Sequence, residues 1–175
     1  MKSKEGWNWL KQIFTYAQGI LEEEKSGEEE EYTDNPNKRI KRDGEIMDIT
    51  WKYVEPLDKE LLLKIEKYFK VKLPEDYKSA LESCNKGKPD KDCFNIETGR
   101  ECVLDYLIDL KDVVKTSEAI KRPDIIPIGY DPFGNVIGFK IDINGKIESL
   151  VFWDHETKSE ANIAKTFTEF LKKLH

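Results

Sequence analysis

The stretch from residue 125 to residue 155 constrains the fold most, because apolar and polar residues alternate on both sides of one turn signal. Asn144-Gly145 is typical of a type I′ hairpin turn, since both central residues of that turn need a positive φ. A turn there predicts that Phe139 faces Leu150 and that Ile141 faces Glu148. The period of two then places one core-facing set on the same side: Ile137, Phe139, Ile141, Leu150 and Phe152. The opposite face is mixed, which predicts partial cover.

The open end of this hairpin is the candidate site of interaction. The predicted register brings Asn135 opposite Asp154, beside the turn-forming run 131–134. Aromatic side chains are favoured anchors in protein interfaces, and neighbouring polar groups add specificity. Six residues form the candidate partner-binding surface: Tyr130, Asp131, Phe133, Asn135, Trp153 and Asp154. The alternative is that these aromatic residues only form the rim of the core.

Length and charge bound the class of protein. The chain has 175 residues, of which 37% are charged, and a net charge of -6. That length suffices for one domain with a core, and the acidic surface disfavours nucleic acid and favours basic partners. No apolar run reaches the roughly 18 residues of a membrane span, and the first residues do not resemble a signal peptide. The three cysteines do not suggest a disulfide framework, so we expect a cytoplasmic protein without a membrane contact.

Residues 1–48 have a different composition from the rest. Apolar residues recur at helical spacing from Trp7 to Leu21, which predicts an amphipathic helix that docks on the main domain or contacts another protein. Seven glutamates follow between Glu22 and Glu31, typical of a solvated, mobile linker. The basic cluster 38–42 is too short to predict direct nucleic-acid binding. We therefore expect a helix and linker in 1–48 and one folded domain in 49–175.

The main domain is predicted to be α+β. A strand is expected over 46–54, followed by a helix with Asp58 as N-cap and a second helix with Pro74 at its first position. Residues 85–87 end that helix, a strand and short helix lead to Ile120, and a last helix runs from about Ser159. Hairpin-linked strands with helices before and after them favour a mainly antiparallel sheet.

The sequence contains few signals for catalysis. His155 lies between Asp154 and Glu156, a set that could shuttle a proton, but such a run is also typical of a solvated turn. No nucleophile motif, phosphate-binding loop or metal-ligand spacing accompanies it. We therefore expect no enzymatic activity, no cofactor and no metal.

Three patches in order resemble the SUKH superfamily, the Smi/Knr-type domain. They are LPEDYKSALESCNKG (73–87), IPIGYDPFGNVIGFKID (126–142) and VFWDHETKSEANIAKTFTEFLKKL (151–174). The matching positions are Leu73, Pro74, Tyr77, Gly129, Asp131, Gly134, Asn135, Asp154, Phe167, Phe170 and Leu171. The resemblance covers about residues 52–174 and departs at Asn85-Lys86-Gly87, where the family has an Asn-Gly step.

The resemblance implies helices packed on a mainly antiparallel sheet and a role without catalysis. Bacterial members are implied to be immunity proteins that bind and block polymorphic toxins, often nucleases, and fungal members to be regulatory scaffolds in cell-wall signalling. The sequence thus predicts an immunity protein whose partner is a cognate toxin, a basic nuclease domain. The alternative is an adaptor that uses residues 1–48 to bind signalling or cell-wall-assembly proteins.

Overall fold

The computed structural model describes residues 38–42 and 45–175, and its side chains from residue 48 onward. Among these residues, no helix has the length and apolar character that crossing a membrane requires. The predicted helix in residues 1–21 and the acidic tract lie outside the described residues. The domain boundary after residue 48 stays a prediction, although strand β2 (Glu45–Lys52) runs across it.

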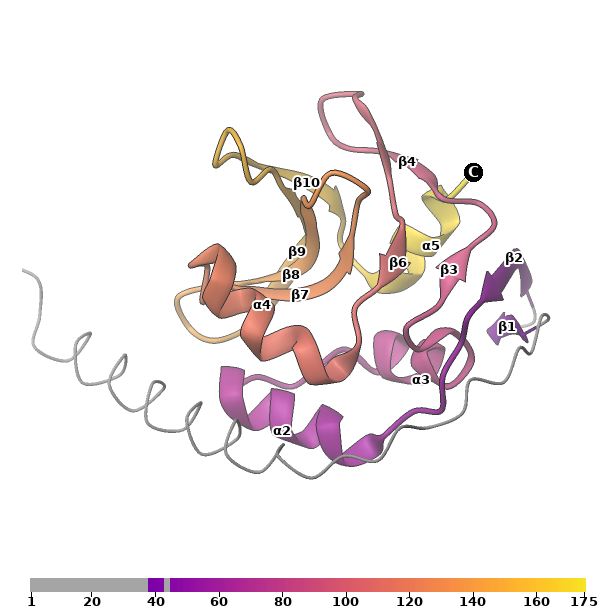
Figure 1. The fold of residues 1–175 in the computed structure, drawn as a ribbon, viewed down its shortest axis with the longest axis horizontal. Coiled ribbons are helices and arrows are strands. Elements are labelled where there is room, and N and C mark those ends of the chain that lie inside the picture. Colours follow the sequence, from indigo (N-terminus) through magenta and orange to yellow (C-terminus); the bar gives the residue numbers. More distant parts are fainter. Residues whose placement is uncertain (1–37, 43–44) are drawn as a thin grey trace, which may run out of the picture. The chain divides into compact units, whose positions relative to one another are not determined.

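Strands dominate the second half of the described chain (Figure 1). The elements in order are β1 (Lys38–Arg42), β2 (Glu45–Lys52), α2 (Lys59–Phe69), α3 (Glu75–Cys84), β3 (Lys88–Pro89), β4 (Cys93–Asn95), β5 (Glu101–Val103), β6 (Tyr106–Leu107), the 3₁₀ turn η2 (Leu110–Asp112), α4 (Val113–Ile120), β7 (Ile125–Tyr130), β8 (Val136–Ile141), β9 (Ile147–Trp153), β10 (Glu160–Ala164) and α5 (Phe167–Lys173).

The main sheet has five strands in the order β10-β9-β8-β7-β6, and every neighbouring pair is antiparallel. β1, β2 and β3 form a second sheet, and β4 and β5 a third. One backbone hydrogen bond, from Leu107 N–H to the Gly87 carbonyl oxygen at 3.0 Å, links β6 to the residue that precedes β3. The predicted α+β class with a mainly antiparallel sheet is confirmed.

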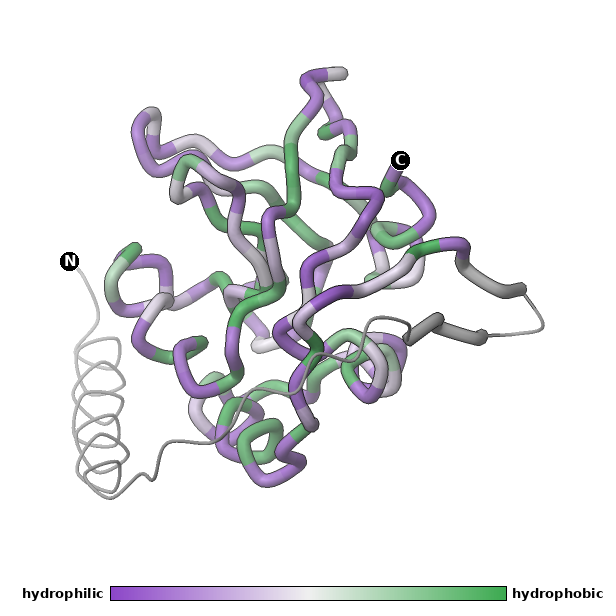
Figure 2. Tube along the Cα trace, turned by 45° about the vertical axis from the view of Figure 1, so that its right-hand side comes forward, coloured by the Kyte–Doolittle hydropathy of each residue, from purple (hydrophilic) through white to green (hydrophobic). Residues whose placement is uncertain are grey.

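One face of the β8–β9 hairpin forms the aromatic core, as predicted. Phe139 faces Leu150 and Ile137 faces Phe152 in the observed register, and all four side chains are buried. Tyr77 of α3 packs edge-on against Phe139 of this face and Phe167 of α5, with ring centroids 5.2 and 5.0 Å apart. Apolar residues therefore gather on the central strands and hydrophilic ones on the loops that leave them (Figure 2).

The other face of the sheet is also covered in part, because α4 packs against β7. A second cluster of buried residues forms there: Ile125, Val136, Val151 and Trp153. Ile120 of α4 and Tyr130 pack on it and stay partly exposed. The prediction of a half-covered second face is therefore correct.

The turn between β8 and β9 differs from the predicted type I′ turn. Gly145 has a φ of +76°, whereas Asn144 is not among the residues with positive φ. The Asp142 carboxylate accepts hydrogen bonds from the Asn144 and Lys146 N–H groups, both at 2.8 Å. These bonds widen the loop, so that Ile141 faces Ile147 and the prediction that it faces Glu148 is wrong.

Helix ends follow their capping residues. Asp58 caps α2, as predicted, and its carboxylate accepts from Glu60 N–H at 2.8 Å. Pro74 is the N-cap of α3 and not its first helical residue, and Lys86 rather than Gly87 has the positive φ after that helix.

The predicted last helix begins too early. Residues 160–164 form β10, which pairs with β9, and α5 starts at Phe167. Thr166 caps α5 by accepting from Glu169 N–H at 3.1 Å, while Glu169 accepts from Lys165 N–H at 2.9 Å. A threonine followed three residues later by a glutamate is a known signal for the start of a helix. Here the threonine is Thr166, seven residues after the predicted start at Ser159.

Candidate functional site

Asp131 fixes the loop between β7 and β8 at the open end of the hairpin. Its carboxylate accepts from Asn135 N–H at 2.7 Å, Phe133 N–H at 2.9 Å and Asn135 Nδ2 at 2.7 Å. Gly134 takes a φ of +87° in this loop, which glycine adopts at little cost. Asp131 is only 7% exposed, so its main contribution is to hold the loop in one shape.

Asn135 connects this loop to the one that follows β9. Its Oδ1 accepts from His155 N–H at 3.0 Å and lies 2.9 Å from His155 Nδ1. The Asp154 carboxylate instead accepts from Glu156 and Thr157 N–H groups at 3.1 and 2.9 Å. The Thr157 N–H above all holds the pKa of Asp154 below its ordinary value. His155 is therefore positioned by an amide, and the flanking carboxylate of Asp154 is used within its own turn and in an ion pair with Arg100 at 3.5 Å.

The six predicted contact residues differ widely in exposure. Phe133 is 76% exposed at the tip of the loop, and Tyr130 is half-buried with its hydroxyl 2.6 Å from Thr116 Oγ1. Asn135 is buried. Trp153 is 3% exposed, because it packs in the apolar cluster under α4 with Lys158 Nζ 5.1 Å from its ring centroid. The expectation that Trp153 offers surface is corrected, while partner contact at this end of the sheet stays a prediction.

Two further tyrosines lie near this end and were missed from sequence. Tyr106 faces Tyr130 across β6 and β7, with ring centroids 6.0 Å apart and ring planes at 73°. Tyr106 is 45% exposed and Tyr53, just after β2, is 53% exposed. Strands as short as β6 carry too few residues for alternation to show, so no sequence signal placed Tyr106 beside Tyr130.

The described residues offer little that resembles a catalytic or metal centre. No group of three or more His, Cys, Asp or Glu side chains within that part of the chain could hold a metal ion. Burial raises the pKa of the Cys84 thiol, which removes it as a nucleophile near neutral pH. The open end instead presents an exposed aromatic ring on a hydrogen-bonded loop with carboxylates nearby, an arrangement suited to contact with another protein.

Comparison with known proteins places the chain in a family. The family model described as SMI1-KNR4 cell-wall, of the SUKH group, matches residues 59–171. The chain belongs to this SUKH family. None of the curated proteins matches the chain.

The family match agrees with the three sequence patches and with the fold of this SUKH domain. It includes the Asp131 loop, His155, Tyr106 and all strands of the main sheet. It begins at the first residue of α2 and so leaves out β1, β2 and Tyr53. Part of the exposed aromatic surface thus comes from residues outside the matched range.

Proposed function

We propose that this SUKH protein is a non-enzymatic, cytoplasmic immunity protein that binds and blocks a cognate toxin domain, a nuclease with a basic cleft. The observation that carries the proposal is Phe133, a large aromatic residue that is 76% exposed on a loop fixed by the buried Asp131 carboxylate. A loop whose backbone is already fixed can bind a partner without losing much backbone entropy.

The charge of the chain supports the choice of partner. A nuclease domain must carry cationic side chains to hold phosphate groups. A chain with a net charge of -6 is attracted to such a cleft, and complementary charge raises the rate of association. Contact alone would block the cleft, so this function needs neither a cofactor nor a metal.

The test combines capture with neutralisation. The full chain serves as bait in lysate of its source cells, and any captured protein is then produced with and without the chain to see whether its toxicity is suppressed. We expect one stoichiometric partner with a basic domain, released by high salt, whose toxicity the chain suppresses. A stoichiometric partner that is harmless when produced alone would contradict the proposal.

Phe133→Ser and Leu63→Ser form a matched pair of variants, since both side chains are apolar and exposed, at 76% and 63%. Leu63 lies on α2, a different element from the loop that carries Phe133. We expect Phe133→Ser to weaken partner binding by about 30-fold, the effect of losing roughly 2 kcal/mol at an interface anchor. Leu63→Ser should leave the affinity unchanged.

The description of the matched family as cell-wall favours a second candidate, a regulatory adaptor. In that case the N-terminal arm, residues 1–48, would bind signalling or cell-wall-assembly proteins. Deletion of residues 1–33 leaves β1 and β2 in place and separates the two functions. The immunity protein would keep its partner after the deletion, and the adaptor would lose it.

A further inference from the structure

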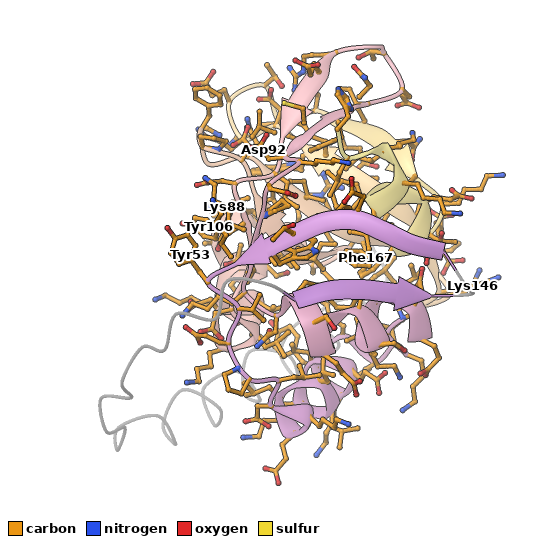
Figure 3. The ribbon with its side chains drawn as sticks, turned by 90° about the vertical axis from the view of Figure 1, so that its right-hand side faces the viewer. Tyr53, Lys88, Asp92, Tyr106, Lys146 and Phe167 are labelled. Atoms are coloured by element: carbon orange, nitrogen blue, oxygen red, sulfur yellow. The ribbon has the colours of Figure 1, made fainter. Side chains whose placement is uncertain are left out.

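Four neighbouring strands bring exposed tyrosines to one edge of the fold. Lys52 of β2 faces Lys88 of β3. The Leu107 N–H of β6 donates a hydrogen bond to the carbonyl oxygen of the residue before Lys88. Tyr106, also of β6, faces Tyr130 of β7. Tyr53, Lys88 and Tyr106 therefore lie close together, with Asp92 near them (Figure 3). We call Tyr53, Tyr106, Lys88, Asp92 and Asp105 the tyrosine surface.

The backbone turns Tyr53 toward solvent. Alternation along β2 would send Tyr53 to the same side as Trp51, which is 0% exposed. Tyr53 instead has a φ of 59°, a left-handed conformation that is unfavourable for a bulky residue. Its side chain is 53% exposed as a result. Strain of this kind clusters at functional sites, where the exposed position is itself useful.

Tyr106 is held in place by its neighbours. Its ring packs edge-on against Tyr130, at 6.0 Å between centroids. The Tyr130 hydroxyl is in turn 2.6 Å from Thr116 Oγ1 of α4. Tyr106 is nevertheless 45% exposed, so part of its side chain is accessible to a partner. A partner that stacks on this ring would meet a group whose position is already fixed.

Two carboxylates and two cations lie around these rings: Asp105 and Asp92, and Lys88 with Lys52, which faces it across β2 and β3. The Asp105 carboxylate pairs with the Lys88 ammonium group. The Asp105 hydrogen bond above all raises the pKa of Lys88, although burial opposes it, and the charges of Asp105, Asp92 and Tyr53 add to the rise. Asp92 contributes a further negative charge. The surface therefore combines exposed aromatic rings with carboxylates beside them.

We infer that the tyrosine surface binds an arginine-bearing segment of the protein partner. A guanidinium group is planar and weakly hydrated, so it stacks on a tyrosine ring while its N–H groups pair with a carboxylate. A lysine ammonium group is more strongly hydrated and cannot form the paired contact. The identity of the partner as a toxin rests on the proposed function, whereas the chemistry of the contact rests on these residues.

The test uses the full chain with isotope-labelled tyrosine rings and a capped Gly-Arg-Gly tripeptide as the probe. Two matched tripeptides serve as controls. Gly-Lys-Gly keeps the positive charge but replaces the planar guanidinium group with an ammonium group, and Gly-citrulline-Gly keeps the planar shape but has no charge. We expect the ring signals of Tyr53 and Tyr106, assigned with single Tyr→Phe variants, to shift saturably with the arginine peptide. The lysine and citrulline peptides should bind at least five-fold more weakly.

Variants locate the binding. Tyr53→Ser and Tyr106→Ser should each weaken binding of the arginine peptide at least five-fold, and Leu63→Ser should not change it. Thermal unfolding checks that each variant is folded, and Tyr53→Asn replaces Tyr53→Ser if needed, because asparagine tolerates the left-handed conformation. Unchanged affinity in the double variant Tyr53→Ser, Tyr106→Ser would overturn the inference.

The two proposals can fail separately. If the double variant still binds and neutralises a captured toxin with full affinity, the tyrosine surface is not the contact, while the immunity function stands. If the captured partner is not toxic but Tyr53 and Tyr106 bind the arginine peptide, the immunity function fails and the arginine-binding surface stands.

Discussion

Gly138 and Gly129 lie on neighbouring strands, and an added methyl group should affect them very differently. On Gly138 of β8 it would lie 2.5 Å from Ile125 Cγ2 and 2.7 Å from the Ile126 carbonyl oxygen. Both distances are well below van der Waals contact, and the carbonyl belongs to the backbone of β7, which pairs with β8. Gly138→Ala must therefore push two paired strands apart.

The same methyl group on Gly129 would lie 2.6 Å from Leu104 Cδ1 and 3.4 Å from the Tyr106 carbonyl oxygen. The close contact is the end of a flexible side chain, which can turn by about 30° away from its rotamer for about 0.5–1.5 kcal/mol. Overpacking against a backbone that cannot yield costs about 3 kcal/mol or more, and lost ladder hydrogen bonds add about 1 kcal/mol each. We expect Gly138→Ala to reduce the free energy of unfolding by at least about 3 kcal/mol and Gly129→Ala by about 1 kcal/mol.

Urea unfolding followed by tryptophan fluorescence measures both changes, because Trp51 and Trp153 are buried in the described fold. At this chain length about 3 kcal/mol corresponds to a fall in Tm of roughly 6–12 °C. Equal losses in the two variants, or a smaller loss for Gly138→Ala, would refute the reasoning from strand spacing.

Three further predictions concern other parts of the fold. Burial raises the pKa of Glu66, but hydrogen bonds from Lys72, Leu73 N–H and Lys78 together lower it by more. The folded-state pKa therefore lies below its ordinary value. The stabilising contribution of Glu66 is thus complete above the ordinary pKa near 4.5 and is lost as the pH falls through the lower folded value. We therefore expect Glu66→Gln to reduce the unfolding free energy by about 1–3 kcal/mol at pH 7. The reduction should become progressively smaller in acid, which unfolding measured as a function of pH checks. Asp131→Ala should reduce the unfolding free energy by about 2–3 kcal/mol, because three donors lose a charged acceptor; an unchanged urea midpoint would argue against this role. Iodoacetamide mapped by mass spectrometry should label the partly exposed Cys93 well before the buried Cys84, and equal rates would contradict the placement of Cys84 in the core.

The core of the hairpin was predictable because side chains on a strand alternate with a fixed period. Phe139 faces Leu150 although the turn differs from the predicted one, because the register shift lies between Lys140 and Ile141, at the loop end of the hairpin. The turn was not predictable from Asn144-Gly145 alone, because the competing acceptor is the Asp142 side chain. Local dipeptide preference is weaker than two hydrogen bonds to a carboxylate.

The open end of the hairpin was located correctly, but the exposure of its residues was not. Trp153 and Val136 alternate onto a face that α4 covers, and a helix of eight residues gives no sequence signal of where it will dock. The start of β10 was missed for a similar reason: Ile163 fits an apolar position in either a helix or a strand, and the pairing of its neighbours Asn162 and Ala164 with β9 decides the outcome.

The position of Tyr53 has a consequence for how relatives could differ. The family match begins at residue 59, so Tyr53 lies before it and Tyr106 within it. Two proteins could share the matched range closely and still present different recognition surfaces, because one of the two tyrosines of the tyrosine surface is supplied by a segment that the family pattern does not define. A change of partner would then require substitutions in the short segment around β2, with the rest of the domain and its core left as they are.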